Sequence, residues 1–468
     1  MRIPRMMIAA PASGSGKTTV ACGLMQALKN RGYKLAAAKC GPDYIDPMFH
    51  REVLGIDSEN LDLFFCEPSV MKKLFAEHAA GADLTVIEGV MGYYDGMALD
   101  SERASSYETA KVLHAPVILV IDGKGAALSV LAVLKGFLTF REDSHIAGVI
   151  LNRVSKAAYP RMKEMIEQGL KEMGYPVPVL GYVPESPLLR MESRHLGLVT
   201  PEEMRDLKIR LEKMGAAVSE TVDLDRIIEI AGAAEELPEN RAACLQGFGY
   251  PEEWPDHPKL RLAVARDRAF CFYYKDNLSL FERLGCELVP FSPLADERLP
   301  QDISGLLLGG GYPELYAKEL SRNVRLRREI RTALKQGLPC HAECGGFLYL
   351  HERMEGADGG FYEMAGFIEG EAVRRERLVR FGYMQIESME NEAFLDKGEK
   401  IRGHEFHYWD STNNGEGCMA RKPGRDIQWK CIHTAGNVFA GFPHLYYYSN
   451  VRFAGRFVEQ MKEYARRK

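Results

Sequence analysis

A glycine-rich segment near the N-terminus places the strongest constraint on the fold. Ser13-Gly-Ser-Gly-Lys-Thr-Thr19 follows an apolar run and opens a stretch in which Val20, Leu24 and Leu28 recur at helical spacing. A strand, a glycine turn and a helix in this order form a phosphate-binding loop. The position that usually holds the first glycine of the motif is Pro11. The context predicts a nucleotide site on an α/β domain.

The residues of this loop have distinct expected roles. Gly14 and Gly16 allow backbone N–H groups to curl around phosphate oxygens, and the helix that begins beside Thr19 adds partial positive charge. Lys17 reaches the outer phosphates, and the Thr18 hydroxyl is a ligand for Mg²⁺. We therefore predict contacts of all five residues with ATP, and Mg²⁺ at Thr18.

Carboxylates follow two further predicted strands. Glu88 ends one apolar run and Asp95 lies in the loop after it, while Asp43 and Asp46 follow the run that ends at Lys39. Because P-loop enzymes need an acid at the end of a neighbouring strand to position the metal, Glu88 is the expected metal-site acid and Asp43 a further candidate. Turn formation is the alternative role for Asp43 and Asp46, since Asp is common in turns beside Gly and Pro.

The alternation of apolar and amphipathic segments along the chain predicts two α/β domains. Short apolar runs alternate with amphipathic stretches, which is typical of parallel sheets flanked by helices. A polar, proline-rich segment at 233–258 reads as a linker between domains at 1–232 and 259–468. The expected strands are Met6–Ala10, Leu35–Lys39, Leu84–Glu88, Val117–Asp122, Ile146–Asn152 and Val177–Val183, then Leu262–Ala265, Leu288–Phe291, Leu306–Leu308, Pro339–Ala342 and Val438–Gly441.

A second motif, in the C-terminal half, has the pattern of a nucleophile elbow. The segment around Cys344 reads as a strand, a sharp turn and a helix that starts at two glycines. A helix N-terminus stabilises a thiolate, and the N–H groups of Gly345, Gly310 and Gly311 are candidate donors to an oxyanion. The alternative is a buried structural cysteine, which suits Cys340 better than Cys344.

A thiolate nucleophile needs a histidine base. His444 follows a predicted strand near the C-terminus and is the first candidate, with His404 and His407 as alternatives. These two alternatives do not have the i, i+4 spacing of a helical zinc site, so a metalloprotease is discounted.

Ordered motifs give nearly the whole chain a resemblance to one family. They are IAAPASGSGKTTV, KCGPDYIDPMFH, EGVMGYYDG, RHLGLV, LLLGGGYPE, AECGGFLYL and PHLYYYSN. Together they resemble the cobyrinic acid a,c-diamide synthases, glutamine-dependent amidotransferases of cobalamin biosynthesis. The resemblance implies an ATPase domain similar to dethiobiotin synthetase, followed by a class I glutamine amidotransferase domain.

The resemblance also implies a reaction. ATP phosphorylates the a and c acetate carboxylates of cobyrinic acid, and ammonia from L-glutamine replaces the phosphate. Cys344 matches the glutaminase nucleophile and His444 its activating histidine, whereas Tyr446 stands where the acid of this site is usual. The pair is therefore either a dyad or takes its acid from elsewhere in the chain, and both options stay open.

In the ATPase part, the resemblance assigns loop residues. Lys39 and Asp43 match a nucleotide and substrate-activation loop, to which Asp46 and Asp95 are also assigned. Asn152 lies where related folds contact adenine.

Composition limits the partners and the compartment. Sixty Lys and Arg against 65 Asp and Glu give a net charge of −5, so no overall positive field is available for nucleic acid or an anionic membrane. The apolar stretch Val112–Ile121 is too short to span a bilayer. Ten cysteines without a C-x-x-C pair favour a reducing, cytoplasmic setting. The oligomeric state stays open, with a homodimer as one option.

Three alternative functions remain at this point. A nickel-sirohydrochlorin a,c-diamide synthase shares every motif quoted above. Cobyric acid synthase amidates other side chains and fits the full Gly-Lys-Thr-Thr loop less well. A MinD-like switch ATPase with an inactive amidotransferase domain belongs to a different class, and the intact Cys344 and His444 argue against it.

Overall fold

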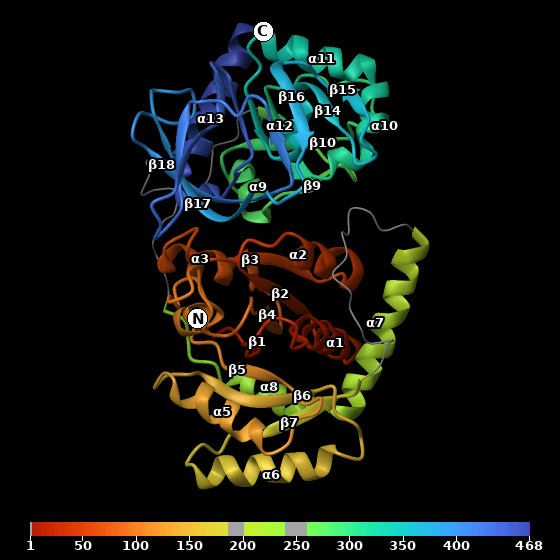
Figure 1. Cartoon of the computed structure of the whole chain (residues 1–468), viewed down its shortest axis with the longest axis vertical. Helices are drawn as coiled ribbons and strands as arrows, with labels where there is room; N and C mark the ends of the chain where they lie inside the picture. The colour runs from red at the N-terminus through yellow and green to blue at the C-terminus, as the bar shows by residue number, and fades with distance from the viewer. Residues whose placement is uncertain (1, 186–200, 239–259) are drawn as a thin grey trace. The chain divides into compact units, whose positions relative to one another are not determined.

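The computed structural model describes residues 2–185, 201–238 and 260–468, in two units, Met1–Arg241 and Ala242–Lys468 (Figure 1). The division falls inside the predicted linker at 233–258. Ala234 and Leu237 in that segment are buried, so packing of the first unit continues past residue 232. Residues 239–259 of the linker lie outside the described residues.

A parallel seven-stranded sheet forms the centre of the first unit. Its strand order is β3-β2-β4-β1-β5-β6-β7. The strands are buried almost throughout, as continuous apolar runs predict for a sheet covered on both faces. They are β1 (Arg5–Ala9), β2 (Leu35–Cys40), β3 (Asp57–Leu61), β4 (Leu84–Glu88), β5 (Val117–Asp122), β6 (Ile146–Asn152) and β7 (Val179–Val183).

Two details of this sheet differ from the sequence prediction. Strand β3 was not predicted because its sequence, DSENL, is polar. Its buried polar groups have partners, since Ser58 Oγ lies 3.0 Å from a ring nitrogen of His50 and Glu59 Oε2 lies 3.5 Å from His78 Nδ1. Strand β7 begins at residue 179 instead of 177 because Pro178 has no N–H for the ladder.

Helices flank this sheet, and the strand order creates a switch point. The chain leaves β1 for β2 on one side and leaves β4 for β5 on the other, so the carboxyl ends of the adjacent strands β1 and β4 border the crevice in which such sheets bind ligands. The helices are α1 (Lys17–Asn30), α2 (Ile45–Phe49), α3 (Pro68–His78), α4 (Ser106–Leu113), α5 (Ser129–Thr139), α6 (Tyr159–Glu172), α7 (Pro201–Thr221), which packs on α1, and α8 (Leu224–Gly232).

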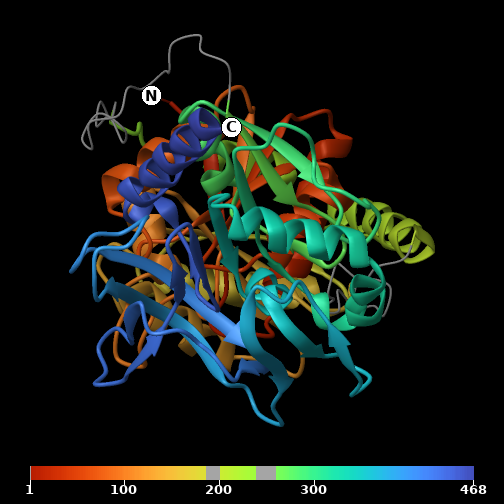
Figure 2. The same ribbon diagram turned by 90° about the horizontal axis from the view of Figure 1, so that it is seen from above.

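The second unit has a six-stranded sheet of order β10-β8-β11-β13-β23-β22, parallel except for β22. Together with the first sheet, it confirms the α/β class with two mainly parallel sheets. The strands are β8 (Leu260–Ala265), β10 (Cys286–Phe291), β11 (Gly305–Leu308), β13 (Cys340–Glu343), β22 (His433–Ala435) and β23 (Val438–Gly441). The helices are α9 (Lys275–Arg283), α10 (Ala317–Arg322), α11 (Val324–Lys335), α12 (Gly345–Leu350) and α13 (Val451–Arg467), which ends the chain (Figure 2, dark blue).

Additional, mostly antiparallel strands of the second unit were not predicted; all but β9 and β12 follow β13 in the chain. They form sheets of order β15-β14-β16-β19 and β21-β20-β17-β18-β24, beside the short pair β12-β9. Pairing of β18 with β24 sets His404 opposite His444. The strands are β9 (Phe270–Phe272), β12 (Gly310–Gly311), β14 (His351–Glu355), β15 (Phe361–Glu363), β16 (Ile368–Arg374), β17 (Arg380–Ser388), β18 (Lys400–His407), β19 (Trp409–Ser411), β20 (Cys418–Arg421), β21 (Gln428–Cys431) and β24 (His444–Leu445).

Candidate active sites

The glycine-rich loop connects β1 to α1, and the side chain of Asn152 packs against it. Gly16 caps the helix with φ of +96°, and a Cβ at this position would lie 2.0 Å from Asn152 Nδ2. The Asn152 amide donates a hydrogen bond to the Ser15 carbonyl at 3.0 Å. Gly14 also has a positive φ, and Thr19 lies partly buried in the first turn of α1. The adenine contact implied for Asn152 stays a prediction.

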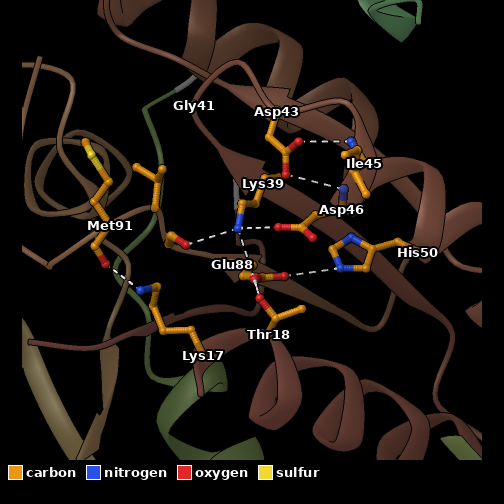
Figure 3. A network of polar contacts seen from close by, with 12 residues as sticks. Lys17, Thr18, Lys39, Gly41, Asp43, Ile45, Asp46, His50, Glu88 and Met91 are labelled. Atoms are coloured by element: carbon orange, nitrogen blue, oxygen red, sulfur yellow. Dashed lines mark hydrogen bonds and ion pairs between the residues drawn. The ribbon is translucent and has the colours of Figure 1, made fainter. Parts of the chain in front are cut away.

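Glu88 is the centre of a polar network at the carboxyl ends of β1, β2 and β4 (Figure 3). Its Oε1 accepts hydrogen bonds from Thr18 Oγ1 at 2.6 Å and from Lys39 Nζ at 3.0 Å. Its Oε2 lies 3.4 Å from His50 Nε2. Lys39 and Glu88 are register partners on β2 and β4, so the parallel sheet itself brings these charges together. The network joins the phosphate-binding loop to the loop after β2.

Lys39 connects Glu88 to Asp46, whose Oδ2 lies 2.6 Å from Lys39 Nζ. Burial opposes the charge on Lys39, but Glu88 and Asp46 outweigh it and raise the pKa of the ammonium group. Burial also opposes the charge on Glu88, but Lys39 and hydrogen bonds from His50 and Thr18 hold the pKa of Glu88 well below its usual range. Burial, with the charge of Glu88 adding to it, raises the pKa of Asp46 to about 7. Glu88 therefore stays ionised while Asp46 titrates near neutral pH.

Lys17 points from the loop toward the segment after β4. Its Nζ donates a hydrogen bond to the Met91 carbonyl (Figure 3). It also donates to the Ala12 carbonyl at 3.4 Å. Burial and the neighbouring charge of Lys39 lower the pKa of Lys17. Asp95 is exposed, accepts the N–H of Gly92 at 2.8 Å, and acts electrostatically on Lys17.

Two of the three residues expected to bind Mg²⁺, Thr18 and Glu88, lie side by side, and the third, Asp43, has other partners. Thr18 and Glu88 present a hydroxyl and a carboxylate side by side, which fits an ion that takes few protein ligands and completes its shell with phosphate and water. Asp43 instead accepts the N–H groups of Ile45 at 3.0 Å and Asp46 at 3.4 Å, the turn-forming role that the sequence left open. Across the described ranges no group of three or more His, Cys, Asp or Glu side chains forms a metal cluster.

In the second unit, Cys344 lies at a strained elbow between β13 and α12. Its backbone has φ of 45° and ψ of −101°, a conformation that a side chain rarely adopts outside functional sites. Its N–H donates to the Gly441 carbonyl at 2.8 Å, which ties the elbow to β23. Cys340 lies inside β13 without exposure, and burial raises the pKa of its thiol. The two cysteines thus differ as the sequence predicted.

Of the three candidate bases, His444 contacts the Cys344 thiol as a hydrogen-bond partner. Burial opposes its charge, but Cys344 and Glu343 outweigh burial and raise the pKa of His444 to about 10. The His404 ring stacks on His444 at 5.1 Å, and burial lowers the pKa of His404. The His407 ring stacks on Phe442 instead, and its Nδ1 donates to the Trp409 carbonyl at 2.6 Å.

The predicted oxyanion donors lie around this pair. A Cβ at Gly310 would lie 2.4 Å from Cε1 of His444, so the glycine turn after β11 packs directly on the imidazole. A Cβ at Gly345 would lie 3.2 Å from the Gly311 nitrogen, which brings the two glycine segments together. The turn and the elbow thus border one site.

Sequence analysis missed Glu343, the residue before Cys344. Glu343 is buried; its Oε1 accepts hydrogen bonds from His341 Nε2 at 2.8 Å and from the Leu445 N–H at 3.1 Å, and its Oε2 lies 3.7 Å from His444 Nδ1. Burial opposes its charge, but the two histidines hold the pKa of Glu343 at about 2. The available signal was an acid at the end of a buried strand in AECGG.

Family models match both units. A CobQ/CobB/MinD/ParA nucleotide binding domain matches residues 6–199, and a CobB/CobQ-like glutamine amidotransferase domain matches residues 261–451. A "Cobyrinate a,c-diamide synthase" from Listeria innocua is 41% identical over 95% of this chain and 97% of its own length. The chain belongs to the cobyrinate a,c-diamide synthase family. Proteins of the same name are 38% identical in Caldanaerobacter subterraneus subsp. tengcongensis, over 98% of this chain and 99% of theirs, and 40% identical in Salmonella typhimurium, over 94% of both.

Family membership makes the protein an ATP-dependent amidating ligase with a nucleotide-binding and a glutamine amidotransferase domain. It also confirms the family resemblance that the ordered motifs indicated. Among residues 2–185, 201–238 and 260–468, no helix has the length and apolar character to cross a membrane.

Proposed function

We propose that this protein amidates the a and c acetate carboxylates of cobyrinic acid, using ATP, Mg²⁺ and L-glutamine. The observation that carries the proposal is the presence, in one chain, of a P-loop network around Glu88 and a Cys344–His444 pair. Relatives named for the same reaction match over nearly the full length.

In the first step, an oxygen of the substrate carboxylate attacks the γ-phosphorus of ATP. The new O–P bond forms as the bond from the γ-phosphorus to the β,γ-bridging oxygen breaks, and ADP leaves. Lys17 is free to turn from the Met91 carbonyl to the transferred phosphoryl group, whose charge it neutralises. Thr18 and Glu88 would hold Mg²⁺, which when bound offsets phosphate charge. Lys39 keeps Glu88 ionised for this role, while Asp43, Asp46 and Asp95 line the substrate-activation loops.

In the second step, ammonia attacks the carbonyl carbon of the acyl phosphate. The C–N bond forms, the bond from carbon to the phosphate oxygen breaks, and inorganic phosphate leaves while ammonia gives up a proton. Phosphorylation is needed because a carboxylate oxygen is otherwise a poor leaving group.

Ammonia comes from glutamine. The Cys344 thiolate attacks the side-chain amide carbon of glutamine, and N–H groups of Gly310, Gly311 and Gly345 stabilise the oxyanion. His444 donates its proton to the departing nitrogen as the C–N bond breaks, leaving a thioester. Water, deprotonated by His444, then hydrolyses the thioester to glutamate and restores the thiol. Such a positioned base typically contributes ~10²–10⁴-fold to the rate.

The proposed setting is the cytoplasm. The cysteines that the structure describes are all free thiols, which suits a reducing compartment. The proposal includes neither nucleic acid nor a membrane as a partner.

The test separates the two half-reactions by variants. Cys344→Ala should lose glutamine-dependent amidation and keep amidation from added ammonium salt, since the thiolate serves ammonia release alone. Lys17→Ala should lose both, because each ammonia source requires the phosphoryl step. Amide formation is counted by mass on cobyrinic acid, and glutamate release is measured separately.

Two results would contradict the assignment. Equal loss of both activities in Cys344→Ala would give this cysteine a structural role, and ammonia-driven product in Lys17→Ala would remove the P-loop from the reaction. Glutamate release without any ATP-dependent amidation would indicate a glutaminase attached to a different ATPase.

A further inference from the structure

Glu343 has the geometry of a group that orients a neighbouring imidazole. It ends β13 directly before the nucleophilic elbow, and its Oε2 lies 3.7 Å from His444 Nδ1. A carboxylate on the Nδ1 side of the ring stabilises a proton on that nitrogen and offsets the charge of the imidazolium. Tyr446 occupies the class I acid position, so any carboxylate that serves His444 comes from another position in the fold.

The other oxygen of Glu343 is fixed from two sides. Oε1 accepts the Leu445 N–H at 3.1 Å, which ties it to the residue after His444. Oε1 also lies 2.8 Å from His341 Nε2, while His341 Nδ1 lies 3.1 Å from the Phe439 carbonyl. Both ring nitrogens of His341 therefore face acceptors, so the ring anchors the carboxylate to β23. With one oxygen anchored, the second keeps its position beside His444.

Tyr446 and its partner form the rival arrangement. The Tyr446 hydroxyl donates a hydrogen bond to Asp276 Oδ2 at 2.5 Å. Asp276 is therefore a second buried carboxylate that contacts the segment around His444. This pair binds α9 to the chain after β24, and the Asp276 carboxylate accepts a phenol hydrogen there. Asp276 is accordingly the matched control for Glu343.

We propose that Glu343 is the positioning residue of the glutaminase site, holding the His444 imidazole through Nδ1, with His341 anchoring Glu343 in turn. The proposal rests on the glutaminase role given above to Cys344 and His444. It supplies the third member of the site from the residue directly before the nucleophile. Glu343 stays ionised and balances the imidazolium charge until His444 gives its proton to the departing amide nitrogen, which leaves as ammonia.

Glu343→Gln keeps the shape of the side chain and removes its charge. We expect glutaminase kcat to fall about 10²-fold with KM for glutamine little changed, since a displaced imidazole affects the reaction more than binding. Glu343→Asp should recover part of the rate because it restores a carboxylate, and Asp276→Asn should stay within about threefold of the unsubstituted protein. Thermal unfolding of all three variants reports any loss of folding.

A pH profile separates positioning from a structural role. Loss of the Glu343 charge lowers the pKa of His444, so the basic limb of glutaminase kcat/KM should move to lower pH in Glu343→Gln and stay in place in Asp276→Asn. The titratable and charged groups that face or act on His444 are Glu343 and, by way of it, His341 on β13, Cys344 at the elbow, and His404, Glu405 and His407 on β18.

The proposal is overturned if Glu343→Gln keeps its rate within about threefold, if its basic limb does not move, or if Asp276→Asn loses as much activity. Ammonia-driven amidation of cobyrinic acid is measured in the same samples and should be unchanged in every variant. If the unsubstituted protein lacks that activity, the proposed function fails while the glutaminase comparison still decides the role of Glu343.

Discussion

Replacing Lys39 by Met tests the charge network of the first unit. Lys39 Nζ lies 2.6 Å from Asp46 and 3.0 Å from Glu88, and the side chain is 7% exposed. At an effective dielectric constant of about 20, each contact is worth about 6 kcal/mol before desolvation is counted. Desolvation of Lys39 offsets much of this, but its removal leaves the carboxylate of Glu88 buried without its cation. Breaking a buried pair in this way costs about 3–5 kcal/mol.

Urea unfolding measures this loss of stability, and the positions of the tryptophans allow the two units to be followed separately. Trp409 and Trp429 lie in the second unit and no tryptophan falls within residues 1–241, so fluorescence does not report on the first unit, while far-UV circular dichroism reports on both. Lys39→Met should lower the circular-dichroism midpoint of the first unit by roughly 2 M urea and leave the fluorescence midpoint in place.

Two further variants control this experiment. Lys124 pairs with Glu185 where both side chains are more than half exposed, so Lys124→Met should cost less than about 1 kcal/mol. Adding Asp46→Asn to Lys39→Met should change the stability little further, because loss of Lys39 raises the pKa of Asp46 and leaves its carboxyl protonated beside Glu88. A loss in Lys39→Met no larger than that in Lys124→Met, or a large further change in the double variant, would refute the reasoning.

Three other substitutions have defined outcomes. Gly16→Ala forces a positive φ on alanine and meets the Asn152 amide, so ATP affinity should fall at least about tenfold in calorimetric titration, whereas glutaminase should be unchanged. Gly310→Ala meets the His444 ring, so glutamine-dependent amidation should fall about 10²-fold while ammonia-driven amidation persists. Arg5→Met leaves four backbone carbonyls without the guanidinium and should lower the unfolding free energy by about 2–5 kcal/mol in denaturant titration.

The parallel strands of both units were predictable because each is a short apolar run bounded by turn residues. Strand β3 was not, since the burial of Ser58 and Glu59 depends on His50 and His78, which come from other positions in the chain. The antiparallel strands between β14 and β21 alternate exposed and buried residues over short lengths, and their pairing depends on contacts far apart in sequence.

The site residues divide in the same way. Lys17 and Cys344 were predictable from the sequence because each lies in a glycine-rich motif. The pairing of Glu88 with Lys39 follows from strand order, since β4 lies next to β2 only in the folded sheet. The local signal of Glu343, an acid at the end of a strand in AECGG, does not reveal its role, because its partner histidine is 101 positions away in the chain and reaches it through β24.

The central claim is that this protein forms two amides on cobyrinic acid at the expense of ATP and glutamine. The direct measurement offers the purified protein ATP, Mg²⁺ and glutamine with cobyrinic acid, and in a parallel reaction with nickel-sirohydrochlorin, and counts the amides on each product by mass. We predict two amides on cobyrinic acid, with ADP and glutamate formed in proportion. Activity confined to nickel-sirohydrochlorin, or ATP hydrolysis without an amide on either compound, would contradict the account.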